Sequence, residues 1–378
     1  MSDKVLMRGT HVLGEAAIRA GCRAYFGYPI TPQNELPEYM AAAFAKMDDA
    51  VFIQAESELA SINMVMGASI AGARAMTSSS SPGISLKQEG ISYLAGMELP
   101  AVIVNMMRGG PGLGNIAPAQ GDYFQATKGG GHGDYRLIVL APAYGQEIAD
   151  MTRAAFDMAD KYRNPVMILG DGMMGQMMEP VVFPEPVDLA SLPKKEWVLD
   201  GAAGRESRII RSLWLDTALE EELNWRLVRK YERITEEVSD QEIYLCDDAE
   251  LIIVAYGTAA RVAKGGVHRA REMGLKVGLY RPKTLWPFPS EPLAGLSRTT
   301  GEIVVFEMST GQMVEDVRLA VEGRCTVSFY GRPGGSVATP EEIARVLSSS
   351  YHRMGSRYRR AGDINAGRDL PRRATGSA

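Results

Sequence analysis

The chain has few cysteines: only three in 378 residues, at Cys22, Cys246 and Cys325. No two of them form a C-x-x-C pair, which excludes an iron–sulfur or structural zinc site of the usual spacing within this chain. Nor does the sequence contain the roughly 18–20 consecutive apolar residues of a membrane span, or an apolar run of signal-peptide length at its start. Sparse, unpaired cysteines suit a reducing compartment. We therefore expect a cytoplasmic protein that does not enter a membrane.

The chain also lacks a large excess of either positive or negative side chains, because its formal net charge is only −5. This weakly acidic balance argues against a general nucleic-acid-binding surface. The hydrophobic content of 46% and the charged content of 23% are ordinary for a globular protein. A chain of this length can hold two domains, each with its own core.

The first half of the sequence alternates expected strands with expected helices. The strands are predicted at 22–27, 51–54, 75–78, 101–106, 137–140 and 166–169, and the helices at 10–20, 33–44, 58–73, 84–95 and 146–161. This alternation favours a doubly wound α/β domain. A proline-rich acidic stretch and a charged helix follow, and a second α/β unit begins near Leu251. The predicted division is 1–185, 186–248, 249–350 and an Arg-rich tail at 351–378.

The tail is predicted to be an extension rather than a folded unit, because it has almost no apolar periodicity. Docking of a partner is the favoured interpretation, and contact with RNA is the alternative. The tail carries seven arginines: Arg353, Arg357, Arg359, Arg360, Arg368, Arg372 and Arg373.

Four polar features fall at or just after the ends of expected strands: Thr31, Glu58, the serines 78–81 and Arg108. In an open α/β sheet the ligand crevice lies beyond the carboxyl ends of the strands, so these side chains are expected to share one rim. Glu56 fits a solvated carboxylate in a first helical turn. Glu58 fits either that description or a partly buried acid at the head of a helix rich in small residues.

Three other motifs lack the residues that would complete them. Gly170-Asp171-Gly172 could begin a diphosphate-binding motif, but the next asparagine is Asn224, beyond the expected linker, so a tight turn after a strand is favoured. The glycine-rich stretch 109–114 is not followed by Lys-Ser/Thr and is not a Walker A loop. His132 lies in a glycine-rich loop and is interpreted as structural rather than catalytic.

Five motifs in co-linear order, GYPITP, QAESELA, SSSSPGISLKQEG, NMMRGGPGLG and LYRPKTLWPFP, resemble the α subunit of 2-oxoacid:ferredoxin oxidoreductases. The resemblance covers roughly residues 1–345 and is strongest to the branched-chain (2-oxoisovalerate) branch. It implies a pyrimidine-side domain of a thiamine diphosphate enzyme, followed by a transketolase C-terminal-like domain. The family's β subunit holds Mg²⁺, the cofactor diphosphate and a [4Fe-4S] cluster. A γ subunit, often a ferredoxin-like δ subunit, and ferredoxin complete the expected partners.

The resemblance also assigns roles to residues of the expected rim. Glu58 matches the family's activating glutamate, whose hydrogen bond to the cofactor pyrimidine N1′ favours the imino tautomer that takes the C2 proton. Thr31 and Arg108 match substrate contacts, and an arginine fork suits a carboxylate. Tyr28, Pro29 and Ile30 are expected to wall the cofactor.

The implied reaction is oxidative decarboxylation of a branched-chain 2-oxoacid to acyl-CoA and CO₂, with reduction of ferredoxin. The pair Leu113-Gly114 stands where many 2-oxoglutarate-type subunits carry hydroxyl residues, and this departure favours an apolar acyl group. The alternatives are the same chemistry on 2-oxoglutarate, pyruvate or an aryl 2-oxoacid, and a non-catalytic scaffold subunit.

Overall fold

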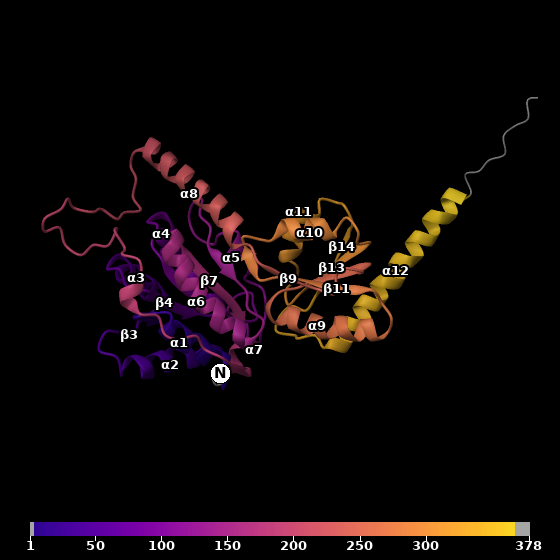
Figure 1. The fold of residues 1–378 in the computed structure, drawn as a ribbon, viewed down its shortest axis with the longest axis horizontal. Coiled ribbons are helices and arrows are strands. Elements are labelled where there is room, and N and C mark those ends of the chain that lie inside the picture. Colours follow the sequence, from indigo (N-terminus) through magenta and orange to yellow (C-terminus); the bar gives the residue numbers. More distant parts are fainter. Residues whose placement is uncertain (1–3, 367–378) are drawn as a thin grey trace, which may run out of the picture.

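Two β-sheets with their covering helices lie next to each other along the long axis of the molecule (Figure 1). The computed structural model describes residues 4–366, and the side chains of residues 4–354. The larger sheet has seven strands in the order β12-β6-β7-β5-β4-β2-β3, and the smaller has five in the order β14-β13-β10-β11-β9. The predicted α/β class is therefore confirmed.

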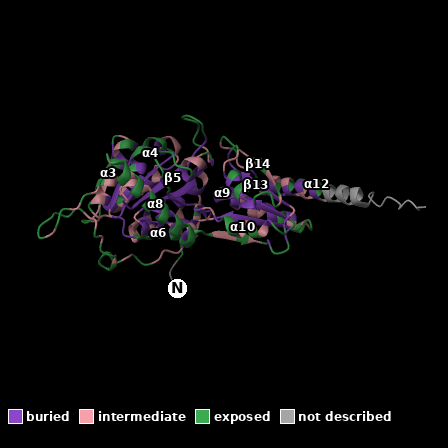
Figure 2. Ribbon diagram, turned by 90° about the horizontal axis from the view of Figure 1, so that it is seen from above, coloured by how far each residue is buried: buried purple, intermediate pink, exposed green. Residues whose placement is uncertain are grey.

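The larger sheet is parallel except at the edge strand β12, which pairs antiparallel with β6. Its central strand β5 is buried at all seven positions, as expected where helices cover both faces of a parallel sheet (Figure 2). The strands are β2 (Ala24–Gly27), β3 (Val51–Gln54), β4 (Ala75–Ser79), β5 (Ala101–Met107), β6 (Ile138–Leu140), β7 (Pro165–Asp171) and β12 (Thr284–Trp286).

The helices divide between the two faces of this sheet. Helices α3 and α4 contribute Ile62, Val65 and Ile91 to the core on one face. On the other face, α1, α2, α6 and α8 contribute residues such as Leu13 and Phe156. The helices are α1 (Gly9–Arg19), α2 (Glu35–Phe44), α3 (Glu58–Ile70), α4 (Ser81–Gly96), α5 (Tyr123–Thr127), α6 (Gly145–Tyr162), α7 (Gly172–Gln176) and α8 (Thr217–Val238).

The smaller sheet is parallel except for its edge strand β9. Helices α9 and α12 cover one face, and α10 and α11 contribute to a core shared with the larger unit. Its elements are β9 (Gln241–Tyr244), β10 (Leu251–Val254), α9 (Gly257–Glu272), β11 (Val277–Pro282), α10 (Ser290–Leu296), β13 (Glu302–Glu307), α11 (Met313–Val321), β14 (Thr326–Gly331) and α12 (Pro340–Ala366).

The region between the units differs in two places from the prediction. A short strand that was not predicted, β8 (Met178–Val181), lies just before the expected linker and pairs antiparallel with β1 (Val5–Arg8). Strand β9 precedes the predicted boundary at residue 249 and joins the second sheet. The charged helix, predicted to span Arg208 to Glu237, is α8 and begins later, at Thr217, because the Asp216 side chain accepts hydrogen bonds from the N–H groups of Ala218 and Leu219 and caps it there. A short 3₁₀ turn, η1 (Leu189–Ser191), lies in the intervening segment.

The predicted boundary at residue 350 falls inside helix α12, so residues 351–366 are helical rather than an extension without secondary structure. The first turns of α12 pack Ile343 and Leu347 into the core beside α9, which gives the helix a fixed start from which it continues. Of the seven arginines of the predicted tail, Arg353 has a described side chain, and Arg368, Arg372 and Arg373 lie outside the described residues. None of the helices described between residues 4 and 366 is long and apolar enough to cross a bilayer.

Candidate active site

The predicted rim forms at the carboxyl ends of β2, β3, β4 and β5, which lie side by side in the larger sheet. Thr31 follows β2, Glu58 begins α3 just after β3, Ser81 begins α4 just after β4, and Arg108 directly follows β5. Parallel strands end at the same edge, which is why residues far apart in sequence meet here.

Glu58 is the first residue of α3 and is only 6% exposed. The Ser57 hydroxyl caps the helix by accepting a hydrogen bond of 3.1 Å from the N–H of Ala60, which fixes the turn that carries Glu58. Within residues 4–354, no hydrogen-bond donor contacts the Glu58 carboxylate. The two oxygens are not among the fully enclosed atoms that lack a partner, so the carboxylate of this otherwise buried residue is still open at the rim, where a ligand could donate to it.

The Glu58 side chain lies directly over Gly83, in the first turn of α4. A Cβ placed on Gly83 would be 2.6 Å from Glu58 Oε1 and would overlap Ser79 Oγ, so only glycine fits. The hydroxyls of Ser79 and Ser80 are buried without a hydrogen-bond partner in the described structure. The predicted polar loop is also shorter than expected, because β4 continues to Ser79 and α4 starts at Ser81.

Arg108 and Thr31 are brought together as predicted for a shared rim. The Arg108 guanidinium donates to the backbone carbonyl oxygens of Thr31 (3.1 Å) and Leu113 (2.9 Å). Its Nε–H is buried and has no partner among the described residues. The Thr31 side chain itself is exposed. The hydrogen bonds to these two carbonyls fix the plane of the guanidinium. The Nε–H remains without an acceptor and could donate to an anionic ligand.

The other predicted residues take less central positions. Tyr28 and Pro29 are exposed and Ile30 is half-buried, all in the turn after β2. His132 lines a different hollow, with Tyr93 and residues of α8. Asp171 is buried and accepts from the N–H groups of Met173 and Met174, so it caps α7, as the interpretation of a tight turn requires.

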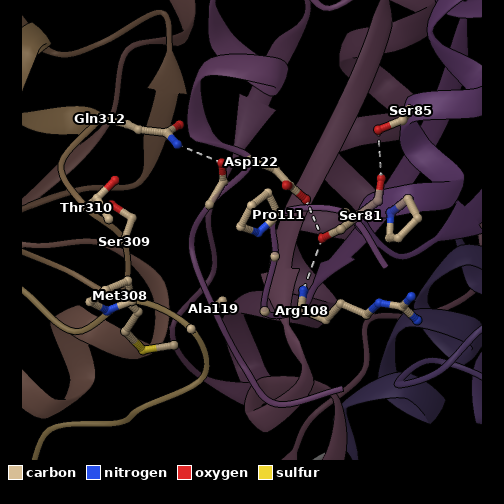
Figure 3. Close-up of a pocket in the computed structure, with 17 residues that line it drawn as sticks. Ser81, Ser85, Arg108, Pro111, Ala119, Asp122, Met308, Ser309, Thr310 and Gln312 are labelled. Atoms are coloured by element: carbon tan, nitrogen blue, oxygen red, sulfur yellow. Dashed lines mark hydrogen bonds between the residues drawn. The ribbon is translucent and has the colours of Figure 1, made fainter. Parts of the chain in front are cut away.

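A cleft of about 470 Å³ runs from Arg108 to the second unit (Figure 3). On one wall the Ser81 hydroxyl donates to Asp122 Oδ2 (2.6 Å) and accepts from the N–H of Arg108 (3.1 Å). Burial raises the pKa of Asp122, although hydrogen bonds from Ser81 and Asn105 oppose the shift. A carboxyl group with a shifted pKa in such a cleft is a candidate functional group.

The opposite wall of the cleft belongs to the turn between β13 and α11. The buried Glu307 carboxylate accepts from the N–H groups at 312–314, at 3.0–3.2 Å. Gln312 then donates to the carbonyl of Gly121, and Gln120 bonds to the N–H of Met308 and to the carbonyl of Tyr256. These hydrogen bonds join the two units at the cleft and so fix the position of one wall relative to the other.

Sequence reasoning missed Lys87, which is fully buried beside the first turn of α3. Its Nζ donates to the backbone carbonyl of Glu58 at 3.3 Å and to the Ser61 hydroxyl. The helical spacing of apolar residues could have indicated this burial, because Lys87 lies three residues after Ile84 and four before Ile91, on the buried face of α4. Asp122 carries no comparable signal, because it lies in a segment without regular spacing.

The residues of the rim fit a cofactor with a flat, polar ring. Glu58 is buried and its carboxylate has no donor among the described residues, and the buried Ser79 hydroxyl, also without a partner, lies with it against Gly83. The donor set does not suit a metal: across the described residues no group of three or more His, Cys, Asp or Glu side chains could hold an ion.

Comparison with known proteins decides the family. Residues 15–243 match the family model for the thiamine-diphosphate-binding domain of pyruvate flavodoxin/ferredoxin oxidoreductases, and residues 249–343 match core domain II of pyruvate:ferredoxin oxidoreductase. This chain belongs to the pyruvate flavodoxin/ferredoxin oxidoreductase family. The family assignment confirms the resemblance found in the motifs.

Individual members of the family agree with this assignment. The chain is 51% identical to ketoisovalerate oxidoreductase subunit VorB of Methanothermobacter thermautotrophicus, over 89% of this chain and 95% of that one. The corresponding protein of Methanothermobacter marburgensis is 49% identical, over 90% and 96%. Identity to 2-oxoglutarate synthase subunit KorA of Methanothermobacter thermautotrophicus is 36%, over 92% and 99%. All are named as subunits, so family members of this kind work in hetero-oligomers.

Solved structures show the same architecture. The 2-oxoglutarate:ferredoxin oxidoreductase of Magnetococcus marinus, with 2-oxoglutarate, coenzyme A and succinyl-CoA bound, matches with a TM-score of 0.82 and 27% identity. The match covers 92% of this chain but only 65% of that one. A split-gene transketolase matches with a TM-score of 0.58 at 13% identity, which shows likeness of fold alone.

Replacing Gly83 by alanine is expected to lower turnover of the assembled enzyme by at least about ten-fold, because the new methyl group displaces the Glu58 side chain. Overpacking is also expected to cost about 1–3 kcal/mol of unfolding free energy. Steady-state rates and thermal melts measure both effects. Gly295→Ala is the matched control, since Gly295 lies in α10 with no atom within 4 Å of an added Cβ. Wild-type turnover by Gly83→Ala would contradict the contact.

Proposed function

We propose that this chain is the α subunit of a thiamine-diphosphate-dependent 2-oxoacid:ferredoxin oxidoreductase that converts a branched-chain 2-oxoacid to acyl-CoA and CO₂. The observation that carries the proposal is the buried Glu58 carboxylate, which lies over Gly83 without a donor of its own. Bound thiamine diphosphate supplies the carbon nucleophile that decarboxylates 2-oxoacids. The role of this chain is to hold the pyrimidine ring.

Glu58 holds a proton or a hydrogen bond at the pyrimidine N1′, where its burial removes competing water. Tyr28, Pro29 and Ile30 wall the ring. Ser79 offers a hydroxyl without a hydrogen-bond partner beside Glu58 and Gly83. A scaffold that had lost its cofactor would gain stability from an apolar residue in place of a buried, unpaired acid. Retention of Glu58 with this geometry therefore favours a working site over a scaffold.

Arg108 and Thr31 are the proposed contacts of the 2-oxoacid. The guanidinium is already oriented by two backbone carbonyls, so its buried Nε–H can bind the substrate carboxylate with little loss of conformational entropy. The Thr31 hydroxyl is exposed at the same rim. Leu113 and Ile116, which are 79% and 62% exposed in the loop after Arg108, favour an apolar acyl group over a second carboxylate.

The rim is incomplete without other subunits. Tyr28, Leu59 and Leu86 are exposed apolar side chains in the segments that follow β2, β3 and β4, and Leu113 and Ile116 are exposed in the loop after β5. Apolar side chains gathered at a polar site mark an interaction surface. We propose that a β subunit covers this surface and brings the diphosphate, Mg²⁺ and a [4Fe-4S] cluster. A γ subunit and a ferredoxin-like δ subunit pass electrons to ferredoxin, and coenzyme A takes the acyl group.

The experiment is a substrate comparison on the anaerobic complex, co-expressed with its partner subunits. Coenzyme-A-dependent reduction of a viologen dye is measured with 2-oxoisovalerate, 2-oxoglutarate, pyruvate and phenylglyoxylate. We expect kcat/KM to be highest for 2-oxoisovalerate. A preference for 2-oxoglutarate would instead support the second candidate, to which the 36% identity with KorA proteins points. Absence of turnover with all four, in a complex that holds cofactor and clusters, would contradict the proposal.

A further inference from the structure

A second hollow, of about 520 Å³, opens at the same rim beside Thr31. It lies where the segments after β2, β5 and β7 meet, at the carboxyl ends of these strands. Most of its lining is apolar, which is usual for a pocket that binds a small organic molecule. The apolar side chains are Pro32, Ile116, Pro118, Met173 and Met177.

Helix α7 forms one wall of this hollow, and several contacts fix its position. Asp171 accepts from the N–H of Met173 at 3.0 Å, and the Gln176 amide donates to the carbonyl of Pro32 at 3.2 Å. Gly172 lies against Pro32, because a Cβ at Gly172 would be only 2.9 Å from the Pro32 Cγ. The hollow therefore belongs to the packing of α7 against the turn after β2.

The hollow adjoins both proposed contacts of the 2-oxoacid. Thr31 is part of its lining, and the carbonyl of Thr31 accepts from the Arg108 guanidinium at 3.1 Å. The backbone of Arg108 also forms a β-bridge with Pro118, on the opposite side of the hollow from α7. A 2-oxoacid that is held by Arg108 and Thr31 therefore has its side chain next to this space.

Glu35 gives the hollow a negative charge. It is the one ionisable side chain in the lining, which contains no lysine, arginine or histidine. Its Oε1 accepts from Arg8 at 3.2 Å and from Gln176 at 3.0 Å. Its Oε2 accepts no hydrogen bond within residues 4–354, so it still presents a negative oxygen. A second carboxylate on a substrate would meet this oxygen and find no cation in the lining.

We propose that this hollow binds the side chain of the 2-oxoacid, that Met173 and Ile116 set the size of the chain accepted, and that Glu35 rejects diacids. This inference rests on the proposed function, in which Arg108 and Thr31 hold the substrate carboxylate. A branched alkyl chain gains from contact with the apolar lining. A 2-oxoglutarate side chain loses the water around its second carboxylate and gains no opposite charge in return.

The test uses the co-expressed complex and measures kcat/KM for 2-oxoisovalerate, 2-oxoglutarate and the longer 4-methyl-2-oxopentanoate. The variants are Met173→Lys, Met173→Ala and Glu35→Gln. The readout is the ratio of kcat/KM for each other acid to that for 2-oxoisovalerate. General damage to the fold lowers all rates together and leaves these ratios unchanged, whereas altered contacts with the side chain change them.

Met173→Lys adds a cation at similar side-chain length and is expected to raise the ratio for 2-oxoglutarate by about ten-fold or more. Glu35→Gln keeps the shape but removes the anion, and we expect a rise of about three-fold in the same ratio. Met173→Ala widens the hollow and is expected to raise the ratio for 4-methyl-2-oxopentanoate by about five-fold or more.

Met273→Lys and Glu38→Gln are the matched controls. Met273 is 58% exposed at the end of α9 in the second unit, and Glu38 is exposed on α2, one turn after Glu35. Both controls are expected to keep the wild-type ratios. Ratios within about two-fold of wild type in every assembled variant of Met173 and Glu35 would overturn the inference. A wild-type preference for 2-oxoglutarate would also overturn it, but would leave the oxidoreductase function intact. Absence of turnover by the wild type with all 2-oxoacids would instead overturn the proposed function, and this inference with it.

Discussion

Glu58→Gln is expected to lower kcat by roughly 100-fold or more while the complex still assembles and binds cofactor. Glutamine has the same shape, so the side chain still fits over Gly83 and the first turn of α3 keeps its cap from Ser57. It cannot, however, share or carry the proton that the pyrimidine N1′ requires. Viologen reduction, with assembly checked by gel filtration and cofactor content by extraction, measures the effect.

Glu56→Gln is the matched control for this prediction. Glu56 is exposed and precedes the helix by two residues, so the same chemical change there is expected to leave kcat within two-fold of wild type. A scaffold subunit would tolerate both substitutions equally. Equal rates for the two variants would therefore refute the assignment of Glu58.

Arg108→Lys is expected to lower kcat/KM for the 2-oxoacid by roughly 100-fold, mainly through KM, and to leave the KM of coenzyme A unchanged. Two nitrogens of the guanidinium donate to the carbonyls of Thr31 and Leu113, and the third, Nε, is the proposed donor to the substrate. An ammonium group is a single point charge and cannot hold both carbonyls while it binds a carboxylate in a fixed plane.

The control for Arg108 is Arg271→Lys. Arg271 pairs with Asp248 at the surface of the second unit, where loss of the fork is expected to change little. Steady-state kinetics with varied 2-oxoacid and varied coenzyme A separate the two KM values. A rise in the KM of coenzyme A without a rise in that of the 2-oxoacid would show that Arg108 serves the other substrate.

Much of the fold could be predicted from the sequence because strands and helices alternate with strong periodicity. The gathering of Thr31, Glu58 and Arg108 followed from their places at strand ends, since parallel strands finish at one edge. The short edge strands β9 and β12 were missed, because three or four residues carry too little pattern to distinguish a strand from a loop.

The parts of the site that were missed depend on packing rather than on motif. Lys87 has the spacing of a core residue, but a lysine is expected at the surface, and only the neutral oxygens of Glu58 and Ser61 explain its burial. Asp122 acquires its environment from Ser81 and Asn105, residues distant in sequence. The cleft itself requires the second unit, so no single motif contains it.

The most direct test of the account is the rate at which the C2 proton of bound thiamine diphosphate exchanges with deuterium. It is measured in the assembled complex by quenching in acid and recording the proton spectrum of the released cofactor. The account predicts that Glu58→Gln slows this exchange by about 100-fold or more, whereas Glu56→Gln keeps the wild-type rate. Exchange at the wild-type rate in Glu58→Gln would show that another group activates the cofactor, and would contradict the central claim.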